Sequence, residues 1–305
     1  MSRIRCTHFY DWSSVNEHLF EAVLNEFAEN GAKELTFATL FSNNVYGDPN
    51  KAASLKRILE KTGVSMPDAH APWGGLWDLC APESFMRRHV VASHNLCLEI
   101  LAEFGVKTYT VHIGSGDCRT NGGVFSPEML ARVSGVLEGI LPTAEKLGVV
   151  VCVENGMEPS CTPDAVARCI EPFKDSPAIG CCLDVGHAHV MDPGVPRKGR
   201  DLPFNDNFDA VNWGGKLRGG LVPFAEAVRR LAPYIVTTHV HDNDGIYDQH
   251  LCPGLGNCDF DAVFSELAKC PRLQSVQNET SFQASGTTIG HACRLFNGFM
   301  AKLGR

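Results

Sequence analysis

Long apolar runs are absent from this sequence, which excludes a membrane-spanning helix from the expected structure. No segment approaches the roughly 18 consecutive apolar residues that a helix needs to cross a bilayer. The first residues, MSRIRCTHFYDW, also lack the apolar core of a secretory signal peptide. We therefore expect a cytoplasmic protein with no membrane partner.

Positive charge is also scarce. Lys and Arg number 27 against 35 Asp and Glu, so the formal net charge is −8. This balance argues against the strongly basic surface with which proteins bind nucleic acid, although an acidic protein can still hold a local basic groove. Nucleic acid is therefore not the partner that we expect.

The cysteine spacings of zinc ribbons and of disulfide frameworks are missing, although the chain has 13 cysteines. No Cys-x-x-Cys pair occurs and the count is odd, while Cys152, Cys181 and Cys182 lie in apolar runs typical of core strands. Free cysteine behaves as a small buried apolar residue, so these positions predict reduced core thiols. No G-x-G-x-x-G follows the first apolar run either, which weakens a dinucleotide-binding interpretation.

Eight short apolar, β-branched segments alternate with helical segments along the chain, among them GVVVCVE, IGCCLD and IVTTHVH. Strands that are apolar on both faces and separated by helices indicate parallel pairing. At 305 residues the chain has the usual length of one α/β barrel. We predict a single (β/α)₈ TIM-barrel domain that spans residues 1–305, with its first helix over roughly residues 15–30.

Acidic or histidine residues stand where six different strands are predicted to end. They are His70, His112, Glu154, Asp184, His239 and Glu279. In a parallel barrel these strand ends meet at one rim, where barrel enzymes place their active sites. A ring of imidazoles and carboxylates is a divalent-metal site, so the pattern predicts a metal-dependent enzyme.

Three of these residues, Glu154, Asp184 and Glu279, each end an apolar strand, where an unpaired negative charge is costly. A metal removes that cost, and His239 supplies a neutral nitrogen donor. The alternative is that each acid pairs with a Lys or Arg elsewhere on the rim. The four residues suit Mn, Co, Mg or Zn, and we expect one ion.

A second group of donors comes from the segments that follow the strands. His187 lies three residues after Asp184, and Asp248 and His250 precede the turn Pro253-Gly254-Leu255-Gly256. Together with His70 and His112, they offer enough donors for two further metals, although a lone histidine is more often structural or a substrate contact.

Two more residues are weaker candidates. His241 shares strand parity with His239 and is interpreted as a partner of the site or as a substrate contact. Trp73, with Trp77 and Phe125, is expected to form an apolar wall against a sugar, although packing residues beneath the rim give the same pattern.

The order of these motifs resembles the xylose-isomerase-like barrel superfamily. From His70 to Glu279 it reads His, His, Glu, Asp-Val-Gly-His, His-x-His-Asp, Asp-x-His, Pro-Gly-x-Gly and Glu. That superfamily includes sugar and sugar-phosphate isomerases and epimerases, inosose dehydratases and apurinic endonucleases. The resemblance is specific for the superfamily and only weakly specific for a reaction.

Within the epimerases, the resemblance implies one metal held by Glu154, Asp184, His239 and Glu279. Glu154 and Glu279 would be catalytic and would exchange protons at a carbon beside a carbonyl. The metal would stabilise the enediolate charge, and His187 would contact a substrate oxygen.

Within the apurinic endonucleases, the resemblance implies three zinc ions instead. Their ligands would be His70, His112 and Glu154 for the first, Glu154, Asp184, His239 and Glu279 for the second, and His187, Asp248 and His250 for the third. The family's Gly-Glu-Gly turn reads Gly254-Leu255-Gly256 here, which is a departure.

We predict a divalent-metal-dependent isomerase or epimerase that acts on a small sugar or sugar phosphate. Three alternatives stay open: a zinc-dependent, apurinic-endonuclease-like phosphodiesterase, a lyase of a cyclitol or keto-sugar, and a barrel whose metal is only structural. The rim segments FATLFSNNVYGDPN and HAPWGGLWDLC argue against the nuclease, because they hold aromatics but no Lys or Arg for phosphates. The oligomeric state is left open, a homo-oligomer included.

One long segment, roughly residues 191–220, lies between the sixth strand and its helix. It is rich in Gly, Pro and Asp, and it carries Arg197, Lys198, Arg200, Lys216 and Arg218. A loop of this length in a barrel is usually functional or disordered. We expect a lid that closes over the rim, with a solvated surface loop as the alternative.

Overall fold

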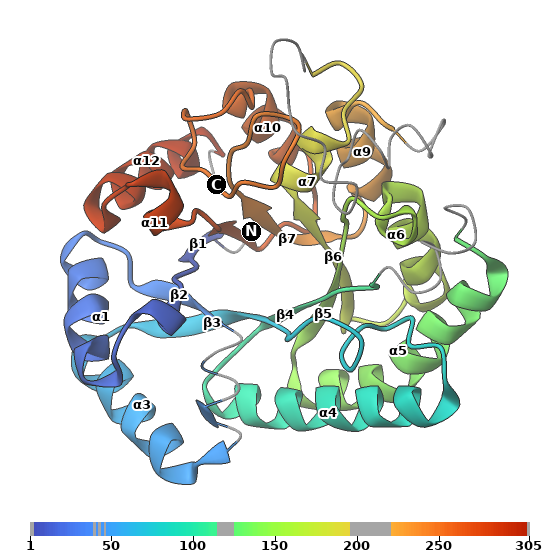
Figure 1. Cartoon of the computed structure of the whole chain (residues 1–305), viewed down its shortest axis with the longest axis horizontal. Coiled ribbons are helices and arrows are strands. Elements are labelled where there is room, and N and C mark those ends of the chain that lie inside the picture. Colours follow the sequence, from blue (N-terminus) through green and yellow to red (C-terminus); the bar gives the residue numbers. More distant parts are fainter. Residues whose placement is uncertain are drawn as a thin grey trace.

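Eight parallel strands close into one barrel, in which β1 pairs with both β2 and β8 (Figure 1). The computed structural model describes residues 3–38, 41, 44, 45, 47–114, 125–195 and 221–303. The strands are β1 Arg5–His8, β2 Glu34–Phe37, β3 Ser65–His70, β4 Thr108–Val111, β5 Val150–Glu154, β6 Ile179–Asp184, β7 Ile235–Val240 and β8 Ser275–Asn278. The predicted TIM barrel is confirmed.

Helices between the strands surround this barrel (Figure 1). They are α1 Phe20–Glu29, α3 Pro49–Thr62, α4 Ser84–Glu103, α5 Pro127–Leu147, α6 Pro163–Ile170, α7 Val185–Val190, α9 Phe224–Leu231, α10 Phe260–Leu267, α11 Phe282–Ser285 and α12 Ile289–Lys302. Ser126 and Thr162 cap α5 and α6, each followed by proline at the first helical position. None of the described helices is long and apolar enough to span a membrane.

The inside of the barrel holds a buried charge that is fully paired. Asp68, only 3% exposed, accepts hydrogen bonds from Thr7 (2.6 Å) and Thr108, and its carboxylate lies 3.3 Å from the Arg5 guanidinium. A buried carboxylate without such partners would be strongly destabilising.

The cysteines predicted to be core thiols occupy buried strand positions. Cys152, Cys181 and Cys182 are fully buried, and within the described ranges no cysteine forms a disulfide. Burial raises the pKa of each of these three thiols. Their prediction as small buried residues is confirmed.

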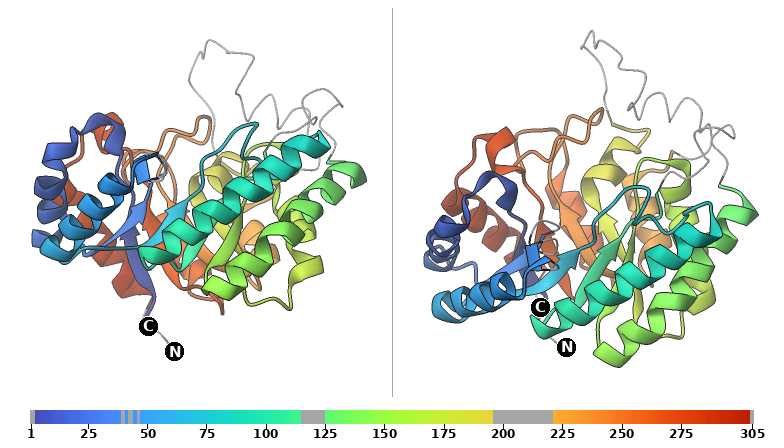
Figure 2. Two further views of the ribbon diagram at one scale, coloured as in Figure 1. Left: turned by 90° about the horizontal axis from the view of Figure 1, so that it is seen from below. Right: turned by 60° about the horizontal axis from the view of Figure 1, so that its bottom comes forward.

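The loop after β7, drawn in orange, lies at the end of the barrel where the strands terminate (Figure 2). This end therefore carries the residues that follow each strand. Of the long segment predicted as a lid, residues 196–220 lie outside the described residues.

Candidate metal centre

The six residues predicted at strand ends all lie at one rim of the barrel. His70, Glu154 and Asp184 are the last residues of β3, β5 and β6. His239 is the next-to-last residue of β7, while His112 and Glu279 directly follow β4 and β8. Each of the six has an ion-pair contact with another member of the set.

Glu154 lies at the centre of this group and is only 3% exposed. Its Oε1 lies 3.0 Å from Nδ1 of His239, and its Oε2 lies 2.9 Å from Nε2 of His112 and 3.4 Å from Nε2 of His70. Burial alone would raise the pKa of Glu154, but the imidazoles of His239 and His112 hold it well below its usual value.

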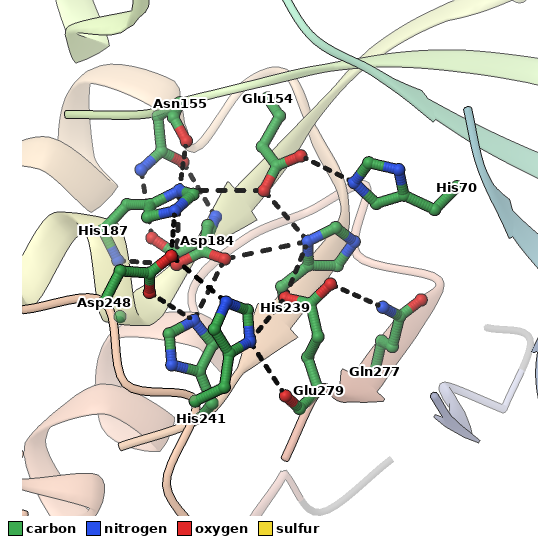
Figure 3. Close-up of polar contacts among 12 residues, drawn as sticks. His70, Glu154, Asn155, Asp184, His187, His239, His241, Asp248, Gln277 and Glu279 are labelled. Atoms are coloured by element: carbon green, nitrogen blue, oxygen red, sulfur yellow. Dashed lines mark hydrogen bonds and ion pairs between the residues drawn. The ribbon is translucent and has the colours of Figure 1, made fainter. Parts of the chain in front are cut away.

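Three carboxylates surround one nitrogen of His239 (Figure 3). Nδ1 lies 3.0 Å from Glu154, 3.2 Å from Glu279 and 3.7 Å from Asp184. Burial opposes a charge on this imidazole, yet Glu279 and Glu154 outweigh it and raise the pKa of His239 to about 9. The imidazolium thus supplies positive charge where a divalent cation between the same carboxylates would supply it.

A second cluster lies beside the first, around Asp248. Its Oδ2 lies 3.1 Å from Nε2 of His187 and 3.1 Å from Nε2 of His250. His187 also links the two clusters, since its Nδ1 lies 3.6 Å from Asp184. Although burial raises the pKa of Asp248, the charge of His187 holds it well below its usual value.

Three histidines share the hydrogen-bonding pattern that is typical of metal ligands. His70, His187 and His250 place Nδ1 at 2.6, 2.9 and 3.1 Å from the backbone carbonyls of Ala71, Asn155 and Glu279. When Nδ1–H is donated to a carbonyl, the lone pair of Nε2 is available to bind a metal. In all three rings Nε2 faces a carboxylate.

The donors at this rim therefore fit a divalent cation. Ligand atoms lie within 4.8 Å of one another in several triplets, including His70–His112–Glu154, Glu154–Asp184–His187 and His70–His239–Glu279. Nitrogen and carboxylate donors suit hard-to-borderline metals such as Mn, Co, Mg or Zn. The assignment of individual ligands stays a prediction.

His241 is buried and contacts a candidate ligand, Asp184, as expected of a residue that supports the site. It is fully buried, its Nε2 lies 3.3 Å from Asp184, and its ring stacks on His250 with the centroids 4.0 Å apart. A Cβ on Gly186 would clash with the His241 ring, so the glycine of Asp-Val-Gly-His makes room for it.

Two neighbours of the centre were missed at the sequence level. Asn155 accepts a hydrogen bond from the Asp184 N–H (2.8 Å) and donates to the Asp184 carbonyl (3.0 Å), which fixes the end of β6. Cys182 places its sulfur within 4.8 Å of ligand atoms of Glu154 and His239. For Asn155 the only sequence signal was its position directly after a strand-end glutamate.

A cavity of about 770 Å³ opens above the centre. Trp73, 61% exposed, lines one side, with its ring 5.6 Å from that of His70. Three more aromatic residues line the cavity: Phe9 and Tyr10, which follow β1, and Phe282, the first residue of α11. Trp77 and Phe125, expected on the same wall as Trp73, pack against the core and are not among the lining residues.

Comparison with known proteins gives one family. The model of the family described as xylose isomerase-like TIM barrel matches residues 25–271. A curated relative, an uncharacterized protein of Methanocaldococcus jannaschii, is 25% identical over 148 residues, which span 47% of this chain and 41% of that protein.

Solved structures with this fold cover nearly the whole chain. A D-tagatose 3-epimerase-like protein has a TM-score of 0.71 and 18% identity, over 99% of this chain and 98% of that one. L-ribulose 3-epimerase gives 0.69 and 17%, over 100% and 96%. A protein of Thermus thermophilus, soaked with ZnCl₂, gives 0.63 and 19%, over 99% and 100%. At these identities the likeness shows the shared fold.

Proposed function

The chain belongs to the xylose isomerase-like TIM barrel family, and from this premise we propose that it is a divalent-metal-dependent sugar isomerase or epimerase. The observation that carries the proposal is the arrangement of Glu154, Asp184 and Glu279 around His239 at the floor of the cavity. Epimerisation by proton transfer removes a proton from a carbon beside a carbonyl and returns one to that carbon, and two positioned carboxylates can serve as the base and the acid.

Glu154 and Glu279 are the proposed proton carriers. They come from β5 and β8, both line the cavity, and both reach the same nitrogen of His239 (Figure 3). One takes the proton from the substrate carbon and the other returns a proton to it. A cation held by Glu154, Asp184, His239 and Glu279 would stabilise negative charge on neighbouring substrate oxygens. His187, which also lines the cavity, is the proposed contact to a substrate oxygen.

The charge of the cavity favours a sugar without a phosphate group. Its lining includes the carboxylates Asp11, Asp78, Glu154, Glu158, Asp248 and Glu279. Within the described ranges, no Lys or Arg lines it. A phosphate would be repelled by this field. Two structural neighbours, a D-tagatose 3-epimerase-like protein and L-ribulose 3-epimerase, are also named after sugars without a phosphate group.

A second candidate function is a three-zinc phosphodiesterase. The separate cluster of His187, Asp248 and His250 favours it, because an epimerase with one metal does not require that cluster. The acidic cavity argues against a polyanionic substrate.

A cytoplasmic location and a single domain over residues 1–305 complete the proposal.

Deuterium exchange tests the leading function directly. The protein is stripped with chelator, reloaded with Mn²⁺, Co²⁺ or Zn²⁺, and incubated with free ketoses in D₂O. Deuterium at the carbon beside the carbonyl, with one bound ion per chain, supports the epimerase or isomerase. Three bound zinc ions with nicking of abasic DNA would support the phosphodiesterase, and neither activity in fully loaded protein would refute both.

A further inference from the structure

A buried carboxylate that belongs to neither cluster holds together the loop that follows β7. Asp242 is fully buried and accepts four backbone hydrogen bonds, two on each oxygen. The donors are Asn243 (2.9 Å) and Cys258 (3.1 Å) on Oδ1, and Gly254 (2.8 Å) and Gly256 (2.9 Å) on Oδ2. The loop of residues 243–258 therefore begins and ends at one side chain.

We call the base of this loop, where Asp242 binds the N–H groups of Asn243, Gly254, Gly256 and Cys258, the neck. Backbone contacts also close it. Asp242 and Leu251 exchange two hydrogen bonds, of 2.7 and 2.8 Å. A Cβ on Gly256 would clash with the carbonyl of Asn243 and with the Asp242 carboxylate, so only glycine fits there. Leu255 is 58% exposed and donates nothing to Asp242. The departure from Gly-Glu-Gly thus changes a position that the neck does not use.

This loop carries Asp248 and His250 to the second cluster. His250 has a φ of 49°, in the left-handed region that side chains rarely adopt. Such a conformation persists only where the surroundings fix it. Here the carbonyl of His250 accepts the Ser281 N–H (2.7 Å), and its Nδ1 lies 3.1 Å from the Glu279 carbonyl. The neck supplies the remaining constraint, because Leu251, the residue directly after His250, exchanges backbone hydrogen bonds with Asp242.

We propose that Asp242 is the positioning residue of the candidate metal centre. It touches no ligand, but by fixing both ends of the loop it holds Asp248 and His250 against His187. A carboxylate is needed because each of its two oxygens accepts two N–H groups. Asparagine offers one oxygen, so it would lose two hydrogen bonds and turn an NH₂ group against two donors. The metal-binding part of the inference rests on the second candidate function, in which His187, Asp248 and His250 hold a cation; the positioning of the loop does not.

Asp242→Asn is the test, and Asp259→Asn is its matched control. Asp259 caps α10 through Oδ1 alone, which accepts Asp261 N–H (3.1 Å) and Ala262 N–H (3.0 Å), so asparagine can replace it. Hydrogen exchange of the metal-free proteins should show protection lost over residues 243–258 in Asp242→Asn and kept in the control. Equal protection in both variants would overturn the proposal.

A double-mutant cycle separates positioning from a general structural role. Calorimetric Zn²⁺ titration of Asp242→Asn should show affinity roughly 10–100-fold weaker, the usual effect of losing support behind a ligand. Added to His250→Ala, the same substitution should cost little more, because Asp242 acts through the loop ligands. Full additivity would overturn the proposal. If the parent protein binds no metal, the proposed function fails, while the exchange experiment still decides the role of Asp242.

A second pair of variants guards against misfolding of Asp242→Asn. Gly256→Ala disturbs the same neck without changing its charge, and Leu255→Ala changes an exposed neighbour. Gly256→Ala should reproduce the exchange and affinity changes, while Leu255→Ala should match the parent. Parental behaviour of Gly256→Ala would also overturn the proposal.

Discussion

At the residue scale, the protonation of His239 decides what the rim can hold. Its imidazolium neutralises the carboxylates of Glu154 and Glu279, which lie 3.0 and 3.2 Å away. A metal ligand must be deprotonated, so a cation and this proton compete for the same place. The metal-free and metal-loaded proteins should therefore respond differently to pH.

The pH dependence of stability in chelator-treated protein follows from this competition. The pKa of His239 is about 9 in the folded state and 6.5 at its ordinary value. Because the pKa of His239 is raised in the folded state, the stabilisation that its charge contributes is complete below pH 6.5 and is lost as pH rises through about 9. Between these values the unfolding free energy should fall by about 1.4 kcal/mol per pH unit. Urea denaturation from pH 6 to 10 should show this slope in the parent but not in His239→Gln, and equal slopes would contradict it.

The two proposed proton carriers can be tested one at a time. Glu154→Gln and Glu279→Gln should each leave the barrel folded and abolish turnover, because each loses a ligand charge and a proton carrier. Circular dichroism checks the fold, and solvent deuterium exchange checks the proton step. Glu138→Gln, on the exposed face of α5, should behave as the parent. Full exchange in either active-site variant would restrict that residue to metal binding.

The strand-end residues were predictable because apolar residues are spaced differently in strands and in helices. A polar residue at the end of an apolar strand therefore lies at the rim of the barrel. The partners of Asn155 and Asp242 were not, since they are backbone groups brought together by folded turns. Trp77 and Phe125 were wrongly expected on the cavity wall, because an aromatic residue beneath a rim leaves the same signal as one above it.

At the element scale, the short helix α7 connects the two clusters. Asp184 ends β6 and caps α7 by accepting the His187 N–H (2.6 Å). Gly186 in its first turn packs against the His241 ring. The turn Asp-Val-Gly-His thus fixes a candidate ligand at each end, and at Gly186 it leaves no room for a side chain.

Two glycine substitutions in helices should have opposite effects. Gly186→Ala should lower the unfolding free energy by about 1–3 kcal/mol and weaken metal binding, because its Cβ would displace His241. Gly135→Ala in α5 meets nothing within 4 Å and should stabilise by about 0.5–1 kcal/mol. Urea denaturation gives both values. A stabilising Gly186→Ala would show that the approach of His241 is not tight.

Helix starts at Ser126-Pro127 and Thr162-Pro163 were predictable from local chemistry alone. The first helix begins at Phe20, later than the predicted residue 15. Two 3-10 turns precede it, Trp12–Ser14 and Glu17–Leu19, capped by Asp11 and Asn16. Local capping there stabilises tight turns, and the sequence pattern did not distinguish these from the first turn of a helix.

At the scale of the whole molecule, barrel closure ties the two ends of the chain to one sheet. Four residues of β1 pair with four of β8, from Arg5 with Ser275 to His8 with Asn278. A barrel missing one strand exposes two edges and its interior. We therefore expect one cooperative unfolding transition, with near- and far-ultraviolet circular dichroism coinciding. Two separate transitions would refute the single-domain assignment.

The closed neck at Asp242 makes residues 243–258 a natural cassette for protein engineering. The segment enters and leaves the scaffold at one point, so a designer can exchange its interior without changing the strands on either side. A library that retains Asp242 and both glycines while randomising residues 246–250 would vary the donors offered beside β6 and β7. Selection from such a library could change which metals or substrates the rim accepts while the barrel stays constant.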